Sequence, residues 1–228
     1  MARFQGRVRP TQRISHRVTQ SIFYGFDYAA HHGRPLNVYA VVNLHETDRK
    51  SAVSIVEDIR HRFNGWFRRA TKKLFGTALP PFYAYSIENP ANNPHCNLAV
   101  NIPPALRQDF DRKLTQWVTR AQKSCDRFDV DVQDIQPGTD KGVANYIVKG
   151  TDPNYIDHFH LRTLYDQHGL QGLVYGKRAG LSEALDKAAR RGGNFKKRRR
   201  GVSIRLDGAQ PIVQPSGYAP IRTTPAAA

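Results

Sequence analysis

The sequence predicts an α+β protein in which helices pack on one face of an antiparallel-rich sheet. Segments with apolar residues at every second position are typical of strands. They alternate along the chain with longer segments whose apolar residues recur every three or four positions, as in amphipathic helices. Two of the expected strands are separated only by the turn-forming segment NPANNP, which indicates a hairpin. The expected order is β-α-β-β-α-β-α, and the second face of the sheet is expected to be free to carry a site.

The first half of this pattern contains two strands and one long helix. Residues 38–44, VYAVVNL, form a β-branched run after Pro35, which is typical of a buried strand. From Val53 to Leu74 the apolar positions step by three or four, which predicts an amphipathic helix with its basic residues outside. The alternating segment 82–88, FYAYSIE, predicts the second strand.

The second half begins with the return strand of the hairpin. Its apolar face consists of Cys96, Leu98, Val100 and Ile102. Pro103 and Pro104 then begin a second helix, whose apolar stripe extends to Ala121. Residues 128–132 alternate again as a strand, and residues 143–148 are predicted to be helical.

The composition points to a polyanionic partner. The 228 residues include 35 Lys and Arg against 19 Asp and Glu, a net charge of +16, which favours nucleic acid as the partner. Cys96 and Cys125 are too few for a disulfide framework, and no CxxC pair is present. The sequence shows neither a secretory signal nor an apolar run long enough to span a membrane. We therefore expect a cytoplasmic protein with no membrane partner.

The distribution of charge predicts four segments. Residues 1–35 are expected to be a basic N-terminal arm, and residues 36–155 the folded domain. Residues 156–200 are predicted to be a helical basic extension. Residues 201–228, with several prolines and a run of alanines, have the composition of a disordered tail.

Two basic clusters are predicted to contact DNA phosphates. One lies on the first long helix and consists of Arg68, Arg69, Lys72 and Lys73. The other consists of Lys196, Lys197, Arg198, Arg199 and Arg200. Phosphate contacts position a protein on DNA without reading its sequence, so these clusters do not indicate a recognition sequence.

A second set of residues indicates chemistry on phosphodiesters. His95 and Asn97 are two apart on a strand, so both side chains lie on the face opposite its apolar stripe. Glu88 ends the neighbouring strand of the hairpin, and together the three supply ligands that suit Mg²⁺ or Mn²⁺. Tyr146 and Lys149 are three apart and share one face of a helix. A tyrosine beside a lysine and a metal suits transesterification, in which the phenolate attacks a phosphodiester and becomes a phosphotyrosine.

Together, Glu88, the segment PHCNL from Pro94 and the motif Tyr146-x-x-Lys149 resemble the HUH (His-hydrophobe-His) endonuclease superfamily. The chain is most similar to its single-tyrosine Rep-type initiators of rolling-circle replication, over residues 36–155. The resemblance implies a ferredoxin-like or RRM-like sheet. It also implies that Tyr146 nicks single-stranded DNA at an origin, leaving a 5′-phosphotyrosine and a free 3′-OH. Glu88, His95 and Asn97 would be the metal ligands. The sequence shows no Walker A motif, so a host helicase and polymerase are the expected partners.

The chain departs from the family at one ligand, because Asn97 replaces the second His. An amide oxygen is a weaker ligand than imidazole, so we expect either weak binding of Mg²⁺ or Mn²⁺ or a domain that binds DNA without cutting it. The alternatives are therefore a non-catalytic DNA-binding descendant, acting as a repressor or architectural factor, and a basic RNA-binding protein. A literal HUH triplet, His158-Phe159-His160, follows the tyrosine as in relaxases and is an alternative metal site. The sequence does not indicate the oligomeric state.

Overall fold

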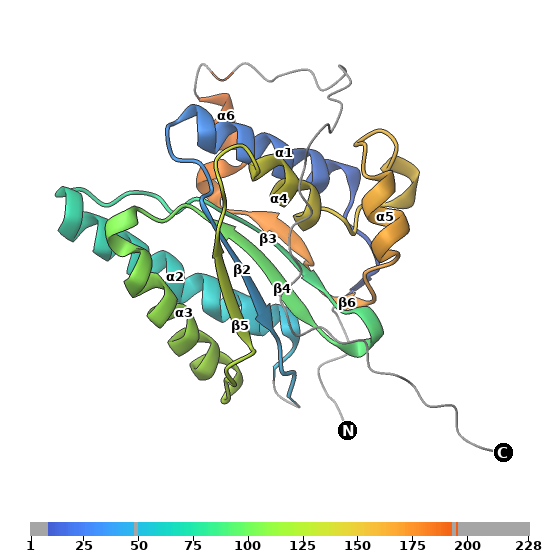
Figure 1. Cartoon of the computed structure of the whole chain (residues 1–228), viewed down its shortest axis with the longest axis horizontal. Helices are drawn as coiled ribbons and strands as arrows, with labels where there is room; N and C mark the ends of the chain where they lie inside the picture. Colours follow the sequence, from blue (N-terminus) through green and yellow to red (C-terminus); the bar gives the residue numbers. More distant parts are fainter. Residues whose placement is uncertain (1–8, 48–49, 193–194, 196–228) are drawn as a thin grey trace.

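The protein is built around a five-stranded antiparallel sheet with the strand order β5-β2-β4-β3-β7 (Figure 1). The computed structural model describes residues 9–47, 50–192 and 195. The strands of the sheet are β2 (Val38–Asn43), β3 (Tyr83–Glu88), β4 (His95–Val100), β5 (Val130–Asp134) and β7 (Ala179–Leu181). A second, two-stranded sheet pairs β1 (Pro10–Thr11) with β6 (Val174–Tyr175). The predicted α+β class, hairpin and antiparallel pairing are confirmed.

Helices cover both faces of the sheet (Figure 1). One face packs against α2 (Ala52–Phe75) and α3 (Arg107–Gln122), and the other packs against α1 (His16–His31) and α4 (Asp140–Ile147). The described residues also form two short helices, α5 (Arg162–His168) and α6 (Lys187–Arg191). The prediction that helices pack on one face only is therefore wrong, and so is the expectation of a free second face.

The first core lies between the sheet and the α2/α3 pair. Its largest fully buried side chains include Phe63 and Phe67 of α2 and Phe110 of α3, which meet the apolar face of β4. The ring nitrogen of Trp66 donates to the Asp109 carboxylate at 2.8 Å, which ties the two helices together. These are the strands and helices whose apolar periodicity the sequence displays most strongly, and their bounds agree with the predicted ones within a few residues.

A second core covers the opposite face of the sheet. Ala84 and Ala99 present small side chains there, so helices approach this face closely. Ile22, Phe23 and Phe26 of α1 pack into this core with Ala144 and Ile147 of α4. Residues 16–31, which the charge pattern assigned to a basic arm, are thus a helix of the folded body, because their arginine lies outside while their apolar side packs inward.

The segment after α4 also differs from its prediction, because it contributes strands as well as short helices. β7 joins the edge of the sheet beside β3, and β6 pairs with β1. The buried Arg178 donates to the backbone oxygens of Ile87, Gln171, Gly172 and Thr11. This one guanidinium therefore fastens the end of β3 to segments far away in the sequence.

The structure does not describe two of the predicted features. The tail 201–228 and the cluster from Lys196 to Arg200 lie outside the described residues.

None of the helices in the described part of the chain is both long and apolar enough to cross a membrane.

The close approach of two backbone segments at the end of β3 predicts a sharp difference between two glycines. Gly172 has φ +66°, and a methyl group added there would lie 1.8 Å from the carbonyl oxygen of Asn89. Gly33 has almost the same φ, +65°, but nothing lies within 4 Å of its added methyl group. We expect Gly33→Ala to lower the free energy of unfolding by about 1 kcal/mol and Gly172→Ala by at least about 2 kcal/mol more, as measured by urea unfolding. Equal losses would show that the loop around Asn89 relaxes at no cost.

Candidate active site

The structure brings together the five residues that the sequence marked as a site. Glu88 ends β3 and pairs directly with His95 at the start of β4. Asn97 follows two residues later on the same face of β4. Tyr146 lies in the last turn of α4, and Lys149 follows that helix closely. All five lie on the side of the sheet that α1 and α4 cover.

The centre of this cluster is the Glu88 carboxylate. Its Oε2 atom accepts hydrogen bonds from His95 Nε2 and from Lys149 Nζ, each at 2.9 Å. Both Glu88 and Lys149 are almost fully buried, at 1% and 3% exposure. Glu88 Oε1 is also buried, and no hydrogen-bond partner is present for it within the described structure. The carboxylate therefore keeps one oxygen available for a ligand.

The surroundings keep Glu88 ionised. Burial acts to raise the pKa of this carboxyl group, but the hydrogen bond from His95 and the charge of Lys149 outweigh it, so the pKa is lowered from its ordinary value. The other ring nitrogen of His95, Nδ1, faces the carbonyl oxygen of Asn93 at 3.3 Å. Both ring nitrogens of His95 are therefore engaged, so this side chain can bind a metal ion only if it gives up one of these two contacts.

Lys149 joins this pair to the candidate nucleophile. Its Nζ lies 3.4 Å from the centre of the Tyr146 ring while it also donates to Glu88. Tyr146 is only partly buried, in contrast to the rest of the cluster. A buried cation thus lies against an aromatic ring that is partly exposed to solvent.

Tyr39 of β2 is a neighbour that the sequence did not mark. Its hydroxyl donates to Asn97 Oδ1 at 2.5 Å, and its ring packs edge-on against Tyr146 with the centroids 6.2 Å apart. Burial, and then the proximity of Tyr146 and Glu88, raise the pKa of Tyr39 well above its ordinary value, so this hydroxyl stays protonated and remains a donor. Tyr39 therefore sets the orientation of the Asn97 amide.

His168, at the end of α5, is the second neighbour that the sequence did not mark. Its ring lies edge-on to Tyr146, with the centroids 5.6 Å apart. Burial, and then the charge of Lys149, lower the pKa of His168, so its ring is neutral at neutral pH and keeps a free lone pair. No periodicity or motif marks this histidine, because its contact with α4 exists only in the folded chain.

The donor atoms of the cluster fit a weakly held, hard divalent cation. Across the described ranges there is no group of three or more His, Cys, Asp or Glu side chains able to hold a metal. The site offers two such side chains, Glu88 and His95, and the amide oxygen of Asn97, which keeps one lone pair beside its bond from Tyr39. The unpartnered Glu88 Oε1 is a free carboxylate ligand, so the residues suit Mg²⁺ or Mn²⁺.

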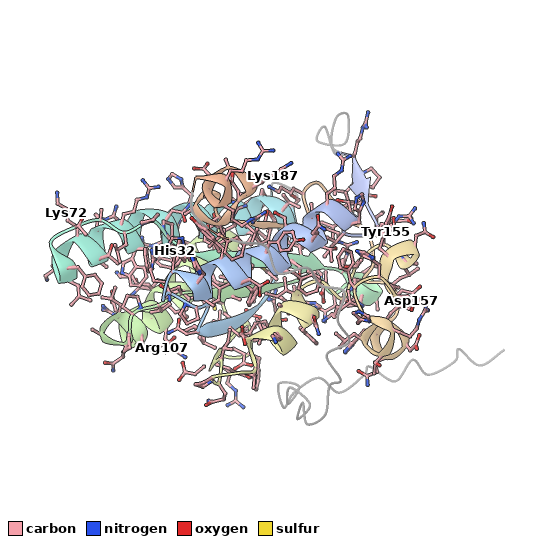
Figure 2. The ribbon with its side chains drawn as sticks, turned by 90° about the horizontal axis from the view of Figure 1, so that it is seen from above. His32, Lys72, Arg107, Tyr155, Asp157 and Lys187 are labelled. Carbon is pink, nitrogen blue, oxygen red and sulfur yellow. The ribbon has the colours of Figure 1, made fainter. Side chains whose placement is uncertain are left out.

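The predicted phosphate contacts on α2 lie apart from this cluster. Arg68, Arg69, Lys72 and Lys73 are exposed, but α2 packs on the opposite face of the sheet from Tyr146. Figure 2 shows Lys72 at one end of the molecule and Tyr155, which follows the tyrosine helix closely in sequence, at the other end. The structure therefore does not join this basic cluster to the candidate site.

The alternative metal site also lies apart from the cluster. His158 and His160 are exposed in a turn, and the Phe159 side chain between them packs against the second core. The backbone at His160 has φ +57°, so the triplet is not a strand of the kind that carries an HUH motif. These histidines belong to none of the contacts around Glu88 that the structure shows.

Comparison of the chain with models of known protein families and with curated protein sequences gives no match.

The buried pair predicts strong coupling between Glu88 and Lys149. Either Glu88→Gln or Lys149→Met leaves a charge buried without its main partner, so each should lower the free energy of unfolding by about 3–5 kcal/mol. The double variant should lose at least about 1 kcal/mol less than the sum of the two, as measured by urea unfolding in a double-mutant cycle. Arg112→Gln, which breaks an exposed ion pair with Asp109, is the control and should have a much smaller effect. Additive losses would argue against the pairing of Glu88 with Lys149.

Proposed function

We propose that this protein is a metal-dependent endonuclease that nicks and rejoins single-stranded DNA through a covalent 5′-phosphotyrosine, as Rep-type initiators of rolling-circle replication do. The observation that carries the proposal is the contact of the accessible Tyr146 with Lys149, which in turn pairs with Glu88 beside His95. A nucleophile, a fixed cation and a carboxylate–imidazole pair are the groups that phosphodiester transesterification needs.

The architecture supports the same class of protein. The succession β2-α2-β3-β4-α3-β5 with the strand order β5-β2-β4-β3 is a ferredoxin-like arrangement. Such a sheet, with a His-containing strand in its centre and a tyrosine helix packed on its face, agrees with the resemblance to HUH endonucleases. Fold alone does not define an activity, so the weight of the proposal rests on the cluster around Glu88.

The residues of the cluster have distinct roles in the proposed reaction. The Tyr146 oxygen forms a bond to the scissile phosphorus while the bond from phosphorus to the 3′-oxygen breaks, and the 3′-oxygen takes up a proton from water to leave a 3′-OH end. In the proposed reaction His168, whose ring lies edge-on to Tyr146, receives the phenol proton, and the Lys149 ammonium, which lies against the Tyr146 ring, balances negative charge on the phosphate. When held by Glu88, His95 and Asn97, Mg²⁺ or Mn²⁺ supplies further positive charge that polarises the phosphate. Rejoining is the reverse step, with a 3′-OH attacking the phosphotyrosine.

In this function the partners are single-stranded origin DNA and, after nicking, a host helicase and polymerase that use the free 3′-OH. The formal charge of +16 suits a phosphate backbone as the ligand.

A non-catalytic DNA-binding protein of the same fold is the second candidate. The observation that favours it is the internal charge balance of the site, because Lys149 neutralises Glu88 and Tyr39 occupies one lone pair of Asn97 without any metal. Such a protein would bind DNA as a repressor or architectural factor and form no covalent adduct.

Replacement of one hydroxyl separates the two candidates. Wild-type protein incubated with single-stranded DNA of its source replicon and Mn²⁺ should give a protein–DNA adduct on a denaturing gel, and EDTA should abolish it. Tyr146→Phe removes the nucleophile and keeps the ring on Lys149, so the adduct should disappear while DNA affinity stays within about twofold. Tyr165→Phe, a change on α5 outside the cluster, should leave the adduct intact.

Two results would contradict the proposal. An adduct that persists in Tyr146→Phe would remove Tyr146 from the reaction. Firm DNA binding by the wild type without an adduct under any metal would leave the non-catalytic protein as the better description.

A further inference from the structure

The segment in front of α1 is fixed against the residues that follow Lys149. The Ile14 amide donates to the Gly150 oxygen at 2.7 Å, and the Asp152 amide donates to the Ile14 oxygen at 2.9 Å. The hydroxyls of Thr19 and Thr151 meet at 2.8 Å in the interior. Residues 9–17 therefore have a set position immediately beside the end of the tyrosine helix.

This segment presents a row of positive charge to solvent. Arg9, Arg13 and Arg17 are exposed, and residues 9–17 include no acidic side chain. Arg13 donates to Asp152 at 3.2 Å, yet 53% of its side chain stays accessible. A phosphate chain can therefore contact the row without the loss of a buried ion pair.

Aromatic rings lie near both ends of this row of arginines. At one end His16 stacks on Tyr155, with ring centroids 4.6 Å apart and planes inclined by 22°. At the other end Tyr175 of β6 pairs with Pro10 of β1 and is 49% exposed. His16 and Tyr155 are partly buried, so each keeps part of its surface accessible beside the positive charge. Aromatic rings beside a positive surface are the usual means of holding single strands, because every base can stack on an aromatic face.

We propose that this surface, which we call the N-terminal track, binds the single-stranded DNA that flanks the scissile phosphate. The track consists of Arg9, Arg13, His16, Arg17, Tyr155 and Tyr175. The inference rests on the proposed function, and it adds to that function the surface that holds the substrate. It also replaces α2 as the place where the cleaved strand lies, since α2 lies beyond the sheet from Tyr146 and Lys72 lies at the opposite end of the molecule from Tyr155 (Figure 2).

Two variants that each lose three positive charges, one on the track and one elsewhere, test the track. The track variant replaces Arg9, Arg13 and Arg17 by Gln in the full chain. The control variant replaces Arg112, Arg120 and Lys123 by Gln, which removes the same charge from exposed positions at α3 on the far face of the sheet. Affinity for a fluorescently labelled, mixed-sequence DNA single strand is measured by anisotropy at several salt concentrations, and thermal melting confirms that both variants fold.

The track variant should bind at least about tenfold more weakly than wild type, and its log–log salt slope should become shallower by roughly 2, since each lost contact with a single strand removes about 0.7. The control variant should stay within about threefold of wild type. For the aromatic end, Tyr155→Ala should weaken binding about tenfold, whereas Tyr155→Phe, which keeps the ring, should bind like wild type.

The possible results separate the track from the proposed function. Equal affinities of the track and control variants, or of Tyr155→Ala and wild type, would overturn the track and leave adduct formation by Tyr146 untouched. Preference for RNA of the same sequence in competition would also overturn it. Failure of the wild type to bind any DNA single strand would overturn both the track and the proposed function.

Discussion

The structure depends on the compensation of one buried charge. Glu88 lies at the end of β3 beneath helices, where an isolated carboxylate would be very costly, and His95 and Lys149 both donate to the same oxygen of it. Because Lys149 follows α4, this contact holds the end of that helix over the hairpin of β3 and β4. The same docking places Tyr146 at the edge of the cluster, so the ion pair that stabilises the fold also positions the candidate nucleophile.

The covering of the second sheet face shapes what the site can do. With α1 and α4 packed on this face, His95 and Asn97 are buried, and Tyr146 is the partly exposed member of the cluster. The site therefore lies at the margin of a packed layer and not on an open sheet. Arg178 stabilises this part of the structure, because its hydrogen bonds to four backbone oxygens hold the end of β3, where Glu88 lies, in place.

Two neighbours of Tyr146, Tyr39 and His168, show why part of the site cannot be predicted from the sequence. Glu88, His95, Asn97, Tyr146 and Lys149 follow from strand and helix periodicities and from a known motif order. Nothing in the local sequence distinguishes Tyr39 from other aromatic residues of buried strands, and nothing distinguishes His168 from other histidines of polar segments. Their roles come from contacts across 107 and 22 positions with Tyr146, which no local pattern encodes.

The sequence by itself determined strands β2 to β5, helices α2 and α3 and the hairpin, and it marked the five residues that meet around Glu88, because periodicity and turn chemistry are local properties that each segment expresses. Only the tertiary structure decided that residues 16–31 cover the sheet, that β6 and β7 come from a segment expected to be helical, and that the α2 cluster lies away from Tyr146. The physical reason is burial. A helix such as α1 and short strands such as β6 and β7 have weak preferences of their own, so their structure and place are set by the apolar surface and backbone groups that the rest of the chain leaves to be covered.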